Sequence, residues 1–121
     1  MITEDYISYE VAKLLKEKGF AEKTFTYFDN ELLCHGNWFE WNNSPMGQIS
    51  APTLQMAIKW LRDVHKIFIE VYADKAYNAK DIIFNPEVWD KNLNSIWRAG
   101  CFTTYEQAVE AAIKYCLENL I

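Results

Sequence analysis

The segment from Pro52 to Ala73 most constrains the fold, because its hydrophobic pattern changes from helical to extended almost without a linker. Apolar residues first recur with the period of an amphipathic helix, at Leu54, Ala57, Ile58, Leu61 and Val64. From Ile67 onward they alternate as in a strand, within a run rich in β-branched and aromatic side chains. Pro52 suits the first turn of a helix, where its missing N–H has no partner to lose. We therefore predict a helix over 52–65 and, directly after it, a strand over 67–73.

Two further helices are predicted, one near each end of the chain. Ser8 can cap a helix over 9–18 by accepting a backbone hydrogen bond, and Gly19 suits the left-handed conformation that often ends a helix. Near the C-terminus, Thr104 followed three residues later by Gln107 matches a capping box. This second signal places a helix over 104–119.

Strand-like sequence occupies much of the remaining chain. Strands are predicted over 24–28, 32–34, 37–41, 67–73 and 95–102. Residues 82–84 form at best a short strand, because Pro86 follows closely and proline cannot donate to a sheet. Residues 42–50 and 85–94 have the composition of loops.

The order of these elements predicts an α+β fold in the form of a two-layer sandwich. In this arrangement a small antiparallel sheet carries two main helices, 52–65 and 104–119, on one face, together with a short N-terminal helix. The chain has 121 residues, of which half are hydrophobic, and no Gly/Ser-rich or Pro-rich linker divides it. We therefore expect a single domain over 1–121.

Composition and charge limit the functional classes. No run of about 18 consecutive apolar residues occurs, and the acidic N-terminus does not resemble a signal peptide, so we expect a cytoplasmic protein that spans no membrane. The net charge is −5 and there is no polybasic tract, which argues against a general nucleic-acid binder. The nucleic-acid alternative depends on Lys59, Arg62 and Lys66, which share one face of the predicted central helix.

Residues that could carry catalysis or bind a metal are few. Cys34, Cys101 and Cys116 show no metal-ligand spacing, so we expect reduced thiols, no metal and no cofactor. Cys34 and His35 are the one adjacent pair of nucleophile and base, which leaves a small thiol-dependent enzyme as an alternative. Consecutive strand residues point to opposite faces, however, which is the wrong geometry for such a pair. We therefore expect that the protein is not an enzyme.

The aromatic residues are the most informative candidates for a binding site. The chain contains five tryptophans, and Trp38, Trp41 and Trp89 fall in or beside predicted loops, where binding residues concentrate. The rings either form an exposed binding patch or close the second face of the sheet as a small core. Our main hypothesis is a non-enzymatic binding or interaction module whose partner is a protein. That partner is either another protein or a second copy of this chain, which would make a homodimer.

Two segments also resemble known sequences. SAPTLQMAIKWLRDVHKIFI at 50–69 and YEQAVEAAIKYCLENLI at 105–121 are similar to small uncharacterised proteins encoded in phages and other mobile elements of gut bacteria. The resemblance covers roughly a third of the chain. It implies a cytoplasmic accessory protein of phage or mobile-element origin, and it brings no catalytic or binding residue with it.

Overall fold

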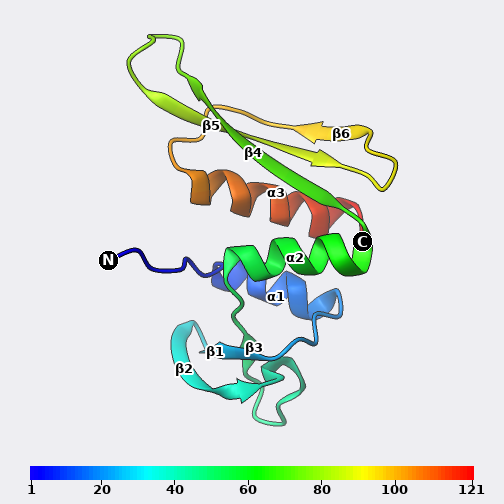
Figure 1. Cartoon of the computed structure of the whole chain (residues 1–121). Helices are drawn as coiled ribbons and strands as arrows, with labels where there is room; N and C mark the ends of the chain where they lie inside the picture. Colours follow the sequence, from blue (N-terminus) through cyan, green and yellow to red (C-terminus); the bar gives the residue numbers. More distant parts are fainter. The chain divides into compact units, whose positions relative to one another are not determined.

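The computed structural model describes all residues from 1 to 121 and contains three α-helices and two three-stranded antiparallel sheets (Figure 1). The elements follow in the order α1 (Tyr9–Glu17), β1 (Thr24–Asp29), β2 (Leu32–Phe39), the 3₁₀ helix η1 (Trp41–Asn43), β3 (Ile49–Ser50), α2 (Leu54–His65), β4 (Phe68–Lys75), β5 (Ile82–Trp89), β6 (Ser95–Arg98) and α3 (Tyr105–Asn119). The predicted α+β class is therefore confirmed. The strands form two sheets, with orders β2-β1-β3 and β4-β5-β6, where the sequence suggested one.

The chain divides into two compact units, residues 1–57 and 58–121. The first unit contains α1 and the sheet β2-β1-β3, and the second contains α3 and the sheet β4-β5-β6. Within the first unit α1 contacts β3, and within the second α3 contacts β4 and β5. Each sheet thus has a helix of its own unit packed against it. The prediction of one domain over 1–121 stays a prediction.

Helix α1 begins and ends where its local sequence signals indicate. The hydroxyl of Ser8 accepts a hydrogen bond of 3.3 Å from the N–H of Val11. At the other end Gly19 has a φ of +90°, which L side chains rarely adopt. The N–H of Phe20 then donates to the carbonyl of Leu15 over 2.9 Å, which is the longer bond of a Schellman ending. Both ends of this helix are therefore determined by residues next to it in sequence.

The first sheet is a hairpin of β1 and β2 with the short strand β3 added on the other side of β1. The hairpin turn contains Asn30, whose φ of +57° lies in the left-handed region that asparagine tolerates. Strand β2 continues to Phe39, so residues 37–39 extend β2 and do not start a separate third strand as predicted for 37–41. The predicted loop over 42–50 also contains part of η1 and all of β3.

One face of this sheet is buried. Thr24, Thr26 and Phe28 of β1 are all nearly inaccessible to solvent. The ring of Phe28 makes an edge contact with Tyr9 of α1, with 5.4 Å between the ring centroids. The buried hydroxyl of Thr26 donates to the carbonyl of Ala51, so this polar group has a partner inside. Because side chains alternate along a strand, the neighbours of these residues in β1 point to the other face.

The second sheet is built on a long, regular hairpin. Eight successive residue pairs join β4 to β5, from Phe68 opposite Trp89 to Lys75 opposite Ile82, without a shift of register. Strand β6 pairs with β5, and its Trp97 lies directly opposite the fully buried Val88. The ring of Trp97 is stacked on Tyr115 of α3 at 4.7 Å. This contact identifies the face of the sheet that α3 covers.

Strand β5 corrects the prediction that residues after 84 form a loop. It runs through Pro86, although proline was expected to end the strand. The carbonyl of Pro86 accepts a bond from the N–H of Ala99, just beyond the end of β6 at Arg98. The missing N–H of Pro86 therefore lies on the side of β5 where β6 has already ended. There it removes no bond of the regular β5–β6 ladder, which explains why proline is tolerated.

Helix α2 follows the predicted stripe in part, because Ile58 is only half-buried and Val64 is exposed. Leu54, Ala57 and Leu61 are buried, as the pattern predicts, and Trp60 is buried beside them. Val64 in the last turn is 54% exposed, so the buried stripe ends one turn earlier than predicted. None of the three helices combines the length and the apolar composition that a membrane-spanning helix needs.

The ending of α1 provides a stability test. Gly19→Ala should lower the free energy of unfolding by about 1–2 kcal/mol, because alanine at this positive φ brings its Cβ close to the backbone. Glu17→Ala, an exposed position in the same helix, is the matched control and should change stability by less than about 0.5 kcal/mol. Urea unfolding followed by circular dichroism measures both. Equal stability of the two variants would contradict the assigned ending.

Candidate functional site

The outer face of the first sheet carries a group of aromatic side chains. In β1, Phe25 and Tyr27 alternate with the buried residues and therefore lie on this outer face. Trp38 of β2 contacts the ring of Phe25, and Trp41 of η1 contacts the ring of Tyr27. We call the group the aromatic face, and it consists of Phe25, Tyr27, Trp38 and Trp41, together with Phe39. Phe39 pairs opposite Thr24 and joins the group through its edge contact with Trp41.

Three members of the aromatic face are strongly exposed. Phe25 is 59% exposed, Trp38 50% and Phe39 44%. The rings of Phe25 and Trp38 contact each other at an angle of 49°, with 4.6 Å between their centroids. Each ring therefore limits the movement of the other while a large part of both surfaces stays open to a ligand.

Trp41 is the fixed centre of the aromatic face. Its ring is stacked on Tyr27 at 4.0 Å and contacts Phe39 edge-on at 5.1 Å. Its indole N–H donates a hydrogen bond of 2.9 Å to the carbonyl of Thr24. Trp41 is half-buried as a result, so one edge of the ring holds the chain in place while the remainder contributes to the surface.

Two local features position Trp41. A Cβ atom added at Gly36 would lie 2.8 Å from Cζ2 of Trp41 and 2.9 Å from Cε1 of Tyr27, so the ring stack needs a glycine beneath it. The next residue, Asn42, joins η1 to β3, because its Oδ1 accepts from the N–H of Ser50 over 2.8 Å. The N–H of Asn42 in turn donates to the hydroxyl of Ser50 over 3.1 Å. These two bonds attach the turn that carries Trp41 to β3.

The three predicted tryptophans are divided between the two units. Trp38 and Trp41 belong to the aromatic face, whereas Trp89 lies in β5 of the second unit. Trp89 is half-buried and lines a pocket of about 320 Å³ together with Phe68, Ile69, Glu70 and Leu93. The prediction did not include Phe25 and Tyr27. The alternating sequence Thr24-Phe25-Thr26-Tyr27 signals a two-faced strand, but it does not say that the threonines are the buried side.

Cys34 and His35 lie on opposite faces of β2. Cys34 is directly opposite Tyr27, and His35 is directly opposite Thr26, so the two side chains follow the alternation of the strand. The thiol of Cys34 donates weakly to the carbonyl of Leu32 over 3.6 Å. The imidazole of His35 contacts a different residue, the ring of Tyr6, at 6.3 Å. The hydrogen-bonded geometry that activates a thiolate is not formed here.

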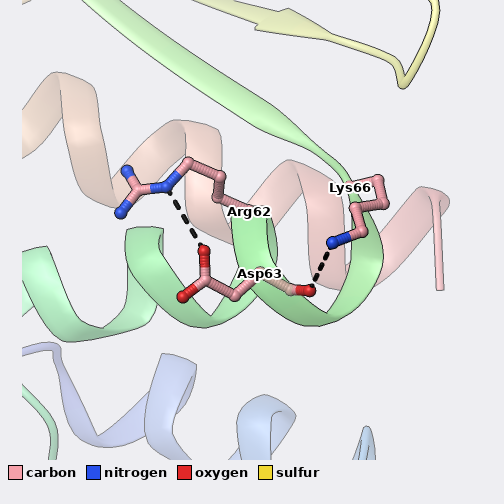
Figure 2. A network of polar contacts seen from close by, with 3 residues as sticks. All are labelled: Arg62, Asp63 and Lys66. Carbon is pink, nitrogen blue, oxygen red and sulfur yellow. Dashed lines mark hydrogen bonds and ion pairs between the residues drawn. The ribbon is translucent and has the colours of Figure 1, made fainter.

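The three cations of the nucleic-acid alternative are exposed on or directly after α2. Figure 2 shows that two of them contact Asp63. The Nε atom of Arg62 lies 3.5 Å from a carboxylate oxygen of Asp63. The ammonium group of Lys66 donates over 2.9 Å to the main-chain carbonyl of Asp63. The local positive charge is therefore partly offset, although both contacts are solvent-exposed and weak.

The remaining titratable groups form no cluster that could hold a metal ion. No group of three or more His, Cys, Asp or Glu side chains is arranged to hold a metal ion. The Nε2 atom of His65 is buried without a hydrogen-bond partner, and its ring contacts Trp60 edge-on at 4.7 Å. In the β5–β6 turn, Asp90 accepts from the N–H of Asn94 and of Asn92, each over 2.9 Å. The bond from Asn94 has the larger effect, and both bonds lower the pKa of Asp90.

The glycine beneath the ring stack provides a test of the aromatic face. Gly36→Ala should lower the free energy of unfolding by about 1–3 kcal/mol, because the added methyl group forces Trp41 and Tyr27 to move. The near-ultraviolet circular dichroism of the stacked rings should weaken with it. Leu32→Ala, a 69% exposed position on the same strand, is the control and should leave both properties nearly unchanged. An unaltered spectrum for Gly36→Ala would show that the rings are not packed over this glycine.

The three free cysteines should differ in reactivity. Cys101 is exposed and Cys34 is half-buried, whereas Cys116 is fully buried in α3, where burial raises the pKa of its thiol to about 12. A thiol reagent should therefore modify Cys34 and Cys101 in the native protein and Cys116 only after unfolding. Mass spectrometry of the labelled peptides measures this. Rapid native labelling of Cys116 would contradict the packing of α3.

Comparison with known proteins supplies no family for this fold and site: no family model, no curated protein and no solved structure matches the chain. The phage or mobile-element origin implied by 50–69 and 105–121 stays a prediction.

Proposed function

We propose that this protein is a non-enzymatic binding module that holds a protein partner on its aromatic face. One observation carries the proposal: Phe25 and Trp38, 59% and 50% exposed, are in contact on one sheet face, and Phe39, 44% exposed, adjoins them through its contact with Trp41. Single exposed apolar residues are ordinary on protein surfaces, whereas contiguous groups mark sites of interaction. Tryptophan, tyrosine and phenylalanine are also the side chains enriched at protein interfaces.

The geometry of the rings supports a prearranged surface. Trp41 is fixed by its bond to Thr24 and by its stack on Tyr27, and Trp38 rests against Phe25. A partner that docks there therefore loses little binding energy to ordering of these side chains. Such rigid aromatic anchors, surrounded by contacts of lower energy, provide most of the affinity in typical protein interfaces.

Charge favours a protein over a nucleic acid as the partner. Residues 1–57, which contain the aromatic face, carry four Lys and no Arg against eight Asp and Glu, a net charge of −4. Proteins that stack single-stranded nucleic acid on aromatic rings combine those rings with a positively charged groove. The alternative contact through Lys59, Arg62 and Lys66 gains no support from the structure, because Arg62 and Lys66 already contact Asp63.

The enzyme alternative lacks the arrangement that it requires. A thiol nucleophile needs a base within hydrogen-bond reach, and Cys34 and His35 lie on opposite faces of β2. A reactive-thiol probe that modified Cys34 faster than a free cysteine near neutral pH would restore this alternative.

Selection from a phage-displayed library of random peptides tests the proposed site. Peptides enriched on the wild-type protein should lose about tenfold or more in affinity for Trp38→Ala and for Phe25→Ala, because both changes remove exposed contact area. Trp38→Ala should leave thermal stability nearly unchanged, since half of the ring is already in solvent. Fluorescence titration gives the dissociation constants.

The matched control is Tyr77→Ala, which removes a fully exposed aromatic side chain from the β4–β5 turn. Its affinities should equal those of the wild type. Selected peptides that ignore both aromatic-face variants would overturn the proposed site. A gel shift at low salt adds a second readout, because retardation of duplex RNA or DNA that is lost in Lys59→Ala would favour the nucleic-acid alternative.

A further inference from the structure

The two sheets have four edge strands, and only one of them is both long and free of a bulge. Strand β3 has two residues and β6 has four, so both are too short to attract another strand. In β2 a bulge interrupts the ladder between the pairs Thr24–Phe39 and Thr26–His35. Between these pairs β1 has one residue, Phe25, whereas β2 has three. Strand β4 has eight residues, pairs only with β5 and keeps one register throughout.

The hydrogen-bonding groups on the open edge of β4 can be identified from its neighbours. Phe84 of β5 exchanges both of its main-chain bonds with Phe102, on the side of β5 away from β4. Main-chain groups alternate in direction along a strand, so the odd-numbered residues of β5 direct their N–H and C=O groups towards β4. The even-numbered residues of β4 lie opposite them and direct their N–H and C=O groups towards β5. The odd-numbered residues of β4 therefore direct their N–H and C=O groups to the open edge.

Three residues in the middle of β4 carry these open groups. They are Ile69, Val71 and Ala73, and their main-chain groups have no partner beyond the β4–β5 hairpin. At the end of the strand the edge is closed, because the N–H of Lys75 donates over 2.7 Å to the carboxylate of Asp74. The accessible template is thus a short stretch of regular backbone from residue 69 to residue 73.

We propose that β4 pairs antiparallel with β4 of a second copy of this chain, around a two-fold axis at Val71. In this register Val71 exchanges main-chain bonds with Val71 of the second copy, and Ile69 exchanges them with Ala73. The two sheets β4-β5-β6 then join into one sheet of six strands. The pairing uses the second unit only, so it is independent of the aromatic face and goes beyond the proposed function.

The positions of the charged side chains favour this register over the two nearest alternative registers. Moving the axis to residue 70 would place Glu70 opposite Glu70, and moving it to residue 72 would place Glu70 opposite Asp74, so both contain opposed carboxylates. With the axis at Val71, Glu70 lies opposite Tyr72, and Phe68 lies opposite Asp74. Like charges directly opposite each other destabilise a strand pair, so the axis at Val71 is the favourable choice.

The proposed register also keeps equivalent faces of the two copies together. Ile69 lies opposite Val88, on the sheet face that α3 covers, and Val71 shares this face by alternation. Pairing of odd-numbered with odd-numbered residues places this face on the same side in both copies. The exposed face with Glu70 and Tyr72 is then continuous across the axis, which leaves both side chains available for a test.

Charge substitution at Tyr72 tests the pairing and its register together. Light scattering at about 100 μM should show a dimer, and a dilution series in the analytical ultracentrifuge gives its dissociation constant. Tyr72→Lys should tighten the dimer about threefold to tenfold, because each added ammonium group lies opposite Glu70 of the other copy. Tyr72→Glu should weaken it by a similar factor. Tyr72 is 40% exposed, so neither change should unfold the monomer.

A proline in β4 provides an independent readout. Val71→Pro removes an N–H that faces the open edge, so it should weaken the dimer about tenfold or more while the β4–β5 bonds remain. Tyr72→Pro, which removes an N–H that faces β5, is the control for damage to the hairpin itself. In the wild type, hydrogen exchange at the amide of Val71 should slow as the concentration rises.

Three outcomes would overturn the proposal. One is a strictly monomeric mass for the wild type at about 100 μM, since stable homodimers survive at that concentration. Another is a dimer whose dissociation constant does not change in Val71→Pro or in the two Tyr72 variants, which would place the interface elsewhere. A dimer weakened by both Tyr72→Lys and Tyr72→Glu would exclude the axis at Val71.

Discussion

The antiparallel pairing of β1 with β2 and β3 is the interaction on which the first unit depends. The pleat of β1 decides which side chains are buried, and it buries Thr24, Thr26 and Phe28. The threonines are tolerated inside because their hydroxyls donate to main-chain carbonyls, that of Thr24 to Thr26 over 2.7 Å. The same pleat turns Phe25 and Tyr27 outward. The exposed aromatic face is therefore the necessary counterpart of the buried threonines.

The second unit depends in the same way on the regular ladder between β4 and β5. Because no bulge interrupts the eight pairs, one face of the hairpin can accept α3, and the other keeps its charged and aromatic residues. On that second face the buried Glu87 lies opposite Arg98, 3.4 Å from its Nε atom. The regularity that allows this packing also leaves the backbone of β4 straight and open at its edge.

The two proposed surfaces would recognise their partners in different ways. The aromatic face would bind through side chains, and its specificity would depend on the shape and chemistry of the partner. The edge of β4 would bind through main-chain groups, for which an identical strand in antiparallel orientation is the matching partner. The two surfaces share no residue, so the two proposals can be tested separately.

The sequence alone determined the features that depend on neighbouring residues. Ser8, Gly19 and Thr104 place helix ends correctly, because a cap is a hydrogen bond within one turn. Only the tertiary structure decided which strands share a sheet, whether Trp38 and Trp89 lie in one unit, and which side of β1 is buried. These depend on pairing between distant segments, which composition and periodicity do not specify. Pro86 is the clearest example, because its place inside β5 is acceptable only where β6 has ended.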